Sequence, residues 1–133
     1  MNGDNALYSK FSVLIVEDNE VNQKVTSAML MHFGIKADIA ENGQLAIEKA
    51  KQTGYDLILM DCQMPVMNGM DATKAIRNFN ESQRTKPDVT IIAMTANASK
   101  DDVQSYYDAG MDDFAPKPVE LEIVQGILYK WLS

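Results

Sequence analysis

Residues 56–61 have the sequence Asp-Leu-Ile-Leu-Met-Asp, a short apolar run that ends on the carboxylate of Asp61. Four consecutive apolar residues without polar alternation are typical of a central strand in a parallel sheet, which helices cover on both faces. Short apolar runs occur four more times, which gives five expected strands in all, and the first, third and fourth of the five are apolar on both faces. The four further runs are residues 12–16, 37–40, 90–94 and 113–115.

Helical patterns occupy the segments between these runs. In the first, residues 20–33, Val21, Val25, Met29 and Phe33 are spaced four apart, which predicts one apolar face. The remaining segments also carry apolar residues at helical spacing and are bounded by capping or turn residues. These further expected helices are residues 44–53, 70–79, 99–110 and 121–131, with a surface loop at 80–88.

Five strands alternating with five helices predict a parallel sheet with right-handed crossovers. We expect an α/β, flavodoxin-like (βα)5 three-layer sandwich, whose five-stranded sheet has the order 2-1-3-4-5. This order places the first and third strands side by side, at the switch point where open sheets bind ligands. The folded unit is expected to span residues 11–133, and residues 1–10 to be a linker or a cloning remnant.

Polar side chains follow the apolar runs, at the ends that share one edge of a parallel sheet. Glu17 and Asp18 follow the first run, and Asp61 ends the third. Thr95 follows the fourth run and Lys117 the fifth. Three carboxylates, a hydroxyl and an amine at one edge are chemistry for a divalent cation and a phosphoryl group.

Magnesium prefers hard oxygen ligands, and Mn²⁺ could substitute for it. Asp18 and Asp61 can supply direct carboxylate ligands, and Glu17 can act directly or through water. The backbone carbonyl of Gln63 could reach the same ion. We therefore expect a Mg²⁺ site at the ends of the first and third strands.

The Asp61 carboxylate can also attack phosphorus and form an acyl phosphate. Lys117 would then pair with one phosphoryl oxygen as a compact point charge. Thr95 would donate a hydrogen bond to another oxygen, and the small Ala96 leaves room for the incoming group.

Composition excludes several other classes. The 133 residues include 12 basic and 19 acidic residues, a net charge of −7, so direct binding of nucleic acid is not expected. No apolar stretch approaches the ~20 residues that span a bilayer, so no membrane contact is expected either. The single cysteine, Cys62, fits a reducing, cytosolic compartment and is expected to be a buried apolar residue. His32 has no partner that would make a metal or triad site.

Taken together, these segments resemble the response-regulator receiver domain. The matching stretches extend over nearly the whole chain, and their combined specificity is very high. Residues 17–23, 60–65 and 94–98 are most similar in style to receivers attached to hybrid sensor histidine kinases. The stretches that match the family are residues 13–19, 56–61, 64–69, 93–96 and 117–118.

The resemblance implies that Asp61 is the phosphoacceptor. Its phosphoryl group would come from a phosphohistidine on a histidine kinase or a histidine phosphotransfer protein. Phosphorylation would then shift the face formed by the last two helices and the fifth strand between two states. It further implies a role for each site residue: Glu17, Asp18, Asp61 and the Gln63 carbonyl as Mg²⁺ ligands, Thr95 as the switch hydroxyl, Lys117 as the phosphate-binding lysine, Phe114 as the switch aromatic residue, and a cis bond before Pro118.

Three contexts remain open: a receiver of a hybrid kinase, which we favour, a phosphorelay intermediate, or a stand-alone regulator. In each, the domain is a signalling phosphoacceptor rather than an enzyme, although a full-length hybrid kinase would be a histidine kinase. It would pass phosphate to a partner histidine, in the cytoplasm or in the cytoplasmic part of a membrane-bound kinase.

Two rivals belong to other classes. An aspartyl-phosphate hydrolase of the haloacid-dehalogenase type needs an acid/base Asp where this chain has Gln63, which cannot transfer protons in that way. A flavodoxin-like flavin-binding module lacks support, because no Gly/Ser/Thr loop that would cradle phosphate or flavin is present.

Overall fold

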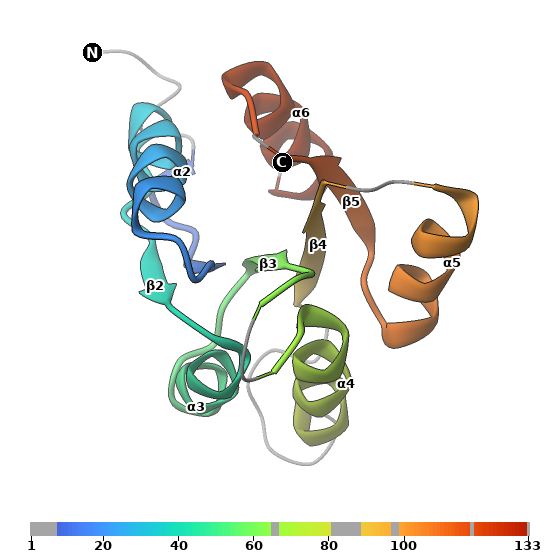
Figure 1. The fold of residues 1–133 in the computed structure, drawn as a ribbon. Helices are drawn as coiled ribbons and strands as arrows, with labels where there is room; N and C mark the ends of the chain where they lie inside the picture. The colour runs from blue at the N-terminus through green and yellow to red at the C-terminus, as the bar shows by residue number, and fades with distance from the viewer. Residues whose placement is uncertain (1–7, 65–66, 81–88, 97–98, 118, 133) are drawn as a thin grey trace.

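The computed structural model describes residues 8–64, 67–80, 89–96, 99–117 and 119–132. Within these residues, five parallel strands form one sheet of order β2-β1-β3-β4-β5, as predicted (Figure 1). The strands are β1 (Val13–Val16), β2 (Asp38–Ala40), β3 (Leu57–Asp61), β4 (Thr90–Thr95) and β5 (Asp113–Pro116). The helices are α2 (Glu20–His32), α3 (Gly43–Gln52), α4 (Gly69–Asn80), α5 (Lys100–Ala109) and α6 (Leu121–Leu132).

Side chains of the central strands alternate between two apolar cores. In β1, Val13 and Ile15 lie in the core beneath α2 and α6, whereas Leu14 and Val16 lie in the core beneath α3, α4 and α5. Strands β3 and β4 alternate in the same way, and Figure 1 shows the two helical layers on opposite faces of the sheet. Burial on both faces explains why these strands are unbroken apolar runs in the sequence.

Capping residues define where several of the helices begin and end. Asn19, Asn42 and Ser99 are N-caps whose side-chain oxygens accept a backbone N–H of the first turn of α2, α3 and α5. Gly34, just after the C-cap of α2, and Gly110, the C-cap of α5, have φ angles of 85° and 108°, which lie in the left-handed region that favours glycine. The Asn19 cap starts α2 directly after the acidic pair that follows β1.

The predicted apolar stripe of α2 is only partly a core face, which corrects the sequence interpretation. Val21 and Val25 are 67% and 43% exposed, whereas Leu30 and Phe33 are buried. The buried residues of α2 are Thr26 and Leu30, each one position after a residue of the predicted stripe, so the core face is rotated away from Val21 and Val25. Two apolar side chains are therefore left exposed beside the candidate site.

Some predictions concern residues at the margins of the structure. Leu121, the first residue of the helix expected at 121–131, is 39% exposed. Tyr8 is buried and packs edge-on against the Phe33 ring, while residues 1–7, and with them most of the predicted linker, lie outside the described residues. Of the predicted loop at 80–88, Asn80 is instead the last residue of α4, and residues 81–88 lie outside the described residues. No helix in the described part of the chain combines the length and apolarity needed to cross a bilayer.

Candidate functional site

The carboxyl ends of β1 and β3 bring three carboxylates together. The two strands are neighbours in the sheet, with Val16 opposite Met60. Carboxylate oxygens of Glu17, Asp18 and Asp61 consequently lie within 4.8 Å of one another, with Asp18 exposed and the other two buried. This is the juxtaposition that the strand order 2-1-3-4-5 predicts.

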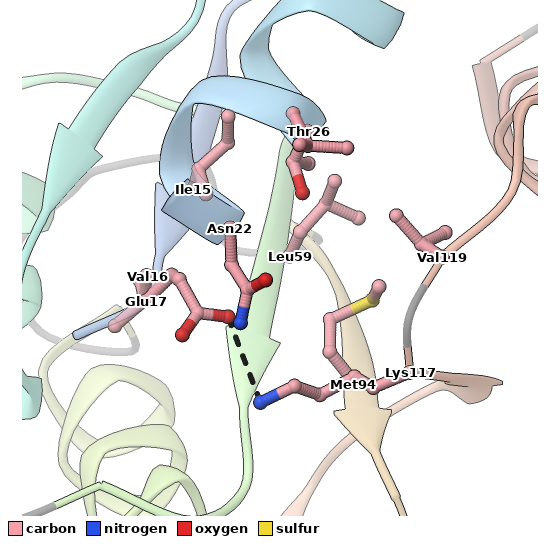
Figure 2. Close-up of a pocket in the computed structure, with 10 residues that line it drawn as sticks. Ile15, Val16, Glu17, Asn22, Thr26, Leu59, Met94, Lys117 and Val119 are labelled. Atoms are coloured by element: carbon pink, nitrogen blue, oxygen red, sulfur yellow. Dashed lines mark ion pairs between the residues drawn. The ribbon is translucent and has the colours of Figure 1, made fainter. Parts of the chain in front are cut away.

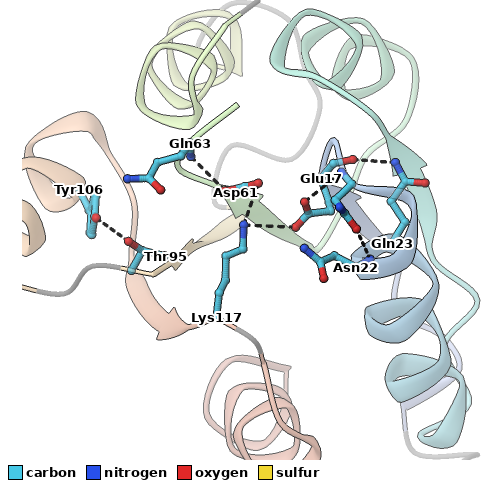
Figure 3. Close-up of polar contacts among 9 residues, drawn as sticks. Glu17, Asn22, Gln23, Asp61, Gln63, Thr95, Tyr106 and Lys117 are labelled. Atoms are coloured by element: carbon cyan, nitrogen blue, oxygen red, sulfur yellow. Dashed lines mark hydrogen bonds and ion pairs between the residues drawn. The ribbon is translucent and has the colours of Figure 1, made fainter. Parts of the chain in front are cut away.

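Lys117 supplies the positive charge of the cluster (Figure 3). Its Nζ lies 3.0 Å from Asp61 Oδ2 and 3.6 Å from Glu17 Oε1. The Lys117 backbone N–H donates to the carbonyl of Thr95, which ties the segment after β5 to the end of β4. Burial lowers the pKa of Lys117, but its contacts with Asp61 and Glu17 outweigh this and raise the pKa above its usual value. The amine is therefore held in its charged form.

Asp61 is a buried carboxylate, and one of its two oxygens accepts no hydrogen bond from the described residues. The residue is 1% exposed, and its Oδ1 accepts the backbone N–H of Gln63 at 3.0 Å. Oδ2 is ion-paired with Lys117, but within the described part of the chain no donor meets it with hydrogen-bond geometry. Buried polar atoms are normally satisfied, so such an oxygen marks a place for an incoming group.

Negative charge is in excess at this edge. Burial raises the pKa of Glu17; the hydrogen bond from the Asn19 N–H lowers it, and the nearby charge of Asp61 raises it further. One amine cannot neutralise three carboxylates, and hard oxygens at this spacing suit a divalent cation. The residues present thus fit the magnesium ion that the sequence predicts. Gln63 has an exposed side chain, and the role of its carbonyl stays a prediction.

Thr95 makes a contact that the sequence interpretation missed. The hydroxyl of this buried residue at the end of β4 lies 2.8 Å from the hydroxyl of Tyr106 on α5 (Figure 3). Tyr106 and Ala109 are spaced three apart on the buried face of α5, so helical periodicity could have placed Tyr106 in the core. Nothing in the sequence pattern points to its hydroxyl partner.

Three other predicted residues have simpler surroundings. Cys62 is buried as predicted, and burial together with the charge of Asp61 raises the pKa of its thiol to about 12, so it is not a reactive thiolate. Phe114 on β5 pairs with Ala93 of β4 and is half-buried, and its switch role stays a prediction. Pro118, for which a cis bond is expected, lies outside the described residues.

A small hollow of about 30 Å³ adjoins the acidic cluster between α2 and the segment that follows β5 (Figure 2). Glu17 and Lys117 form its polar side, and its other walls are mostly apolar. The exposed Val25 of α2 is part of this lining. An apolar surface therefore extends from the site onto the first turns of α2. The lining residues are Ile15, Val16, Glu17, Asn22, Val25, Thr26, Leu59, Met94, Lys117 and Val119.

Comparison with known proteins identifies the family to which this chain is similar. The family model of the response regulator receiver domain matches residues 13–128. Hybrid signal transduction histidine kinase B of Dictyostelium discoideum is 44% identical over 115 residues, which cover 81% of this chain. The matched region is 6% of that kinase, so this chain spans a small fraction of its relative.

Two solved structures share the fold. The receiver domain of sensor histidine kinase PA1611 from Pseudomonas aeruginosa, with a magnesium ion coordinated in its active-site cleft, is 41% identical with a TM-score of 0.81. The similarity covers 91% of this chain and 96% of that one. The Saccharomyces cerevisiae complex of the phosphotransfer protein Ypd1 with the receiver domain of the response regulator Ssk1 gives 35% identity and a TM-score of 0.84, covering 91% and 88%.

The family match extends over the whole described sheet, and the acidic cluster lies at the switch point where the fold binds ligands. The chain therefore belongs to the response regulator receiver domains, the phosphoacceptor domains of two-component and phosphorelay signalling.

Proposed function

We propose that Asp61 is the phosphoacceptor of this domain and that a phosphohistidine supplies the phosphoryl group. The observation that carries the proposal is the buried Oδ2, which is paired with Lys117 but accepts no hydrogen bond from the described residues. No other carboxylate of the cluster combines full burial with a position at the end of the central strand β3.

The chemistry follows from the positions of the charges. An Asp61 oxygen attacks phosphorus, the P–N bond to the donor imidazole breaks, and the imidazole leaves with the bonding electron pair and takes up a proton. Lys117 Nζ, which neutralises Asp61 beforehand, moves to a phosphoryl oxygen as the negative charge moves outward. The Thr95 hydroxyl is the second group proposed to reach that phosphoryl group. The domain thus transfers and holds a phosphoryl group and is not a turnover enzyme.

We further propose that Glu17, Asp18, Asp61 and the Gln63 carbonyl hold Mg²⁺. Asp18 and Asp61 would be direct ligands, and Glu17 a direct or water-mediated one. The ion supplies charge neutralisation between the carboxylate nucleophile and the phosphoryl oxygens. Mn²⁺, which takes similar oxygen ligands, should substitute for it.

Acetyl phosphate with Mg²⁺ tests the acceptor, followed by intact mass measurement. The parent should gain one phosphoryl group, Asp61→Asn should gain none, and a chelator should abolish the gain. Asp71→Asn, which changes an exposed carboxylate on α4, is the matched control and should behave like the parent. A phosphoryl group on Asp61→Asn would refute the assignment.

The partner surface is proposed to be the exposed first turns of α2. Val21 and Val25 are exposed apolar residues of α2, and Val25 lines the hollow beside the acidic cluster, where a protein that carries a phosphohistidine must dock. Exposed apolar patches beside a polar site are typical of interaction surfaces. The Ypd1 complex of a related receiver domain supports a histidine phosphotransfer protein, or a histidine kinase, as the partner class.

Phosphorylated Ypd1 can serve as the probe of this surface. Val21→Lys should slow transfer from Ypd1 by at least tenfold and leave uptake from acetyl phosphate unchanged, because only the protein donor touches α2. Met31→Lys, at the other end of α2 and 51% exposed, is the matched control. Equal slowing with both donors would mean that Val21 acts on the site itself and would contradict the docking proposal.

The similarity to hybrid kinases supports the further proposal that this receiver functions within a hybrid histidine kinase, in the cytoplasm. There it would pass phosphate to a partner histidine. The switch is proposed to run through Thr95 and Phe114 to the face made by α5, β5 and α6. A phosphorylated Thr95→Ala variant should retain phosphate but fail to change that face, as amide chemical shifts in α5 and α6 would report.

A further inference from the structure

Tyr106 is a buried tyrosine whose hydroxyl is hydrogen-bonded to a residue of the candidate site. Tyr106 is 4% exposed, and its hydroxyl oxygen lies 2.8 Å from the hydroxyl oxygen of Thr95. Tyr106 shares its buried cluster with Cys62, the residue after Asp61, and each of these two groups influences the pKa of the other. Tyr106 therefore contacts the residue beside the phosphoacceptor and the hydroxyl proposed to bind the phosphoryl group.

The hydrogen bond between Thr95 and Tyr106 can have either hydroxyl as its donor. Each hydroxyl donates one proton, and Tyr106 lies between a good acceptor, the Thr95 oxygen, and a weak one, the Cys62 sulfur. In the arrangement in which Thr95 donates to Tyr106, the Thr95 proton is directed to α5. Figure 3 shows the Thr95 and Tyr106 side chains pointing toward one another, away from the Lys117–Asp61 pair.

We propose that Tyr106 is a positioning residue that holds Thr95 in the resting arrangement, so that the hydrogen bond between them sets the cost of switching. The proposal rests on the proposed function. A Thr95 proton given to Tyr106 cannot also be given to a phosphoryl oxygen, so phosphorylation and Tyr106 compete for one donor. The phosphoryl group prevails because a hydrogen bond to an ionised acceptor is about twice as strong as a neutral one.

The residue type supports a role beyond packing. A phenylalanine would fill the same space without a hydroxyl that must be satisfied when buried. Phe114, the predicted switch aromatic residue on β5, has no hydroxyl and cannot compete for the Thr95 proton. The competing hydroxyl is thus carried by a different element, α5, which belongs to the face proposed to change on phosphorylation.

The size of the effect follows from the linkage between the two arrangements. A neutral hydrogen bond present in only one of two states biases their ratio by about fivefold. The apparent affinity of a ligand that needs the other state falls by the same factor, because only the competent fraction binds. Removing the Tyr106 hydroxyl should therefore increase the apparent affinity for a phosphoryl mimic about fivefold.

The experiment measures the apparent affinity of beryllofluoride at saturating Mg²⁺. Tyr106→Phe retains the ring and should bind about fivefold more tightly than the parent. Tyr107→Phe, which removes the hydroxyl of the neighbouring tyrosine, 43% exposed, should bind like the parent. In a Thr95→Ala background, Tyr106→Phe should have no effect, since the competed donor is gone. Tighter binding is a result that mere loosening of the core would not give.

A second measurement uses the unmutated protein and so does not depend on the folding of any variant. The ¹³C chemical shift of the Tyr106 Cζ atom should change when beryllofluoride binds, because the Thr95 donor leaves its hydroxyl. An unchanged shift, or equal or weaker binding by Tyr106→Phe, would overturn the role of Tyr106 and leave the phosphoacceptor intact. A parent that binds no beryllofluoride would overturn the proposed function and the role of Tyr106 with it.

Discussion

Charged side chains are neutralised at one end of the sheet and left with an excess of negative charge at the other. At the amino ends of β4 and β5, Arg77 of α4 donates to the carbonyls of Gly110 and Val89 and to the carboxylate of Asp112, at 2.7–2.9 Å. The same Asp112 oxygen accepts the backbone N–H of Ile91. At the carboxyl ends, one amine faces three carboxylates, and a buried oxygen of Asp61 accepts no hydrogen bond from the described residues.

The difference separates what holds the fold together from what it does. A cluster in which cation, carboxylate and carbonyls are mutually satisfied stabilises one arrangement. A cluster with excess negative charge destabilises the protein until a cation binds, which is the usual cost of a binding site. Stability and function are thus assigned to opposite edges, and removing a charged side chain from the two edges of the metal-free protein should change its stability in opposite directions.

The largest expected effect is at the satisfied end. Arg77→Ala removes three hydrogen bonds and leaves the Asp112 carboxylate without its cation, so the free energy of unfolding should fall by about 3 kcal/mol. Urea denaturation measures this loss. Phosphorylation of Asp61 by acetyl phosphate should persist wherever the variant is folded, because Arg77 is remote from the acidic cluster.

Lys74 provides the control for that prediction. It is an exposed cation on the same helix, and Lys74→Ala should change the stability by less than about 0.5 kcal/mol. If Arg77→Ala left stability unchanged but slowed phosphorylation, the division between a structural and a functional edge would be wrong.

The fold was predictable because its signals are local and repeated. The unbroken apolar runs of β1, β3 and β4 indicate strands that helices cover on both faces. The polar residues that follow these runs indicate which edge of the sheet carries the site. The partial exposure of α2 was not predictable from spacing. The spacing of Val21, Val25 and Met29 indicates a helix, but the buried residues are Thr26 and Leu30, so spacing alone does not fix which side faces the sheet.

The second prediction is the reverse effect at the acidic end, produced by metal. Mg²⁺ at one hundred times its dissociation constant should raise the free energy of unfolding by about 2.7 kcal/mol. Asp18→Asn should lose most of this gain, because it removes a direct ligand. Asp113→Asn, a carboxylate near the amino end of β5, should keep the full gain. Equal stabilisation of both variants would place the ion elsewhere.

The acidic cluster could be predicted from the sequence, but its internal contacts could not. The strand order alone brings Glu17, Asp18 and Asp61 together. The pairing of Lys117 with Asp61 depends on the path of the chain after β5, and the Tyr106 contact depends on how α5 packs against β4. Such side-chain pairings follow from tertiary packing, for which hydrophobic periodicity carries no signal.

The third prediction tests how tightly the acidic end is tied to α4. A Cβ added at Gly69 would overlap the backbone carbonyl oxygen of Asp61, so Gly69→Ala should cost about 2 kcal/mol and weaken Mg²⁺ binding. Gly126→Ala in α6 is the control: a Cβ there meets nothing within 4 Å, and the stability should rise by ~0.5–1 kcal/mol. Unchanged Mg²⁺ affinity in Gly69→Ala would show that the Asp61 loop tolerates displacement.

The smallest expected effect isolates the charge excess itself. Because burial and Asp61 raise the pKa of Glu17 above 4.5, its ionisation opposes folding, and the stability it contributes below pH 4.5 is lost as pH rises through the raised pKa. Without metal, Glu17→Gln should therefore match the parent at pH 4 and exceed its stability by about 1 kcal/mol at pH 8. Thermal denaturation across this range measures the difference. A Gln variant less stable than the parent at pH 8 would mean that the Lys117 ion pair outweighs the repulsion, and that this edge is balanced like the other.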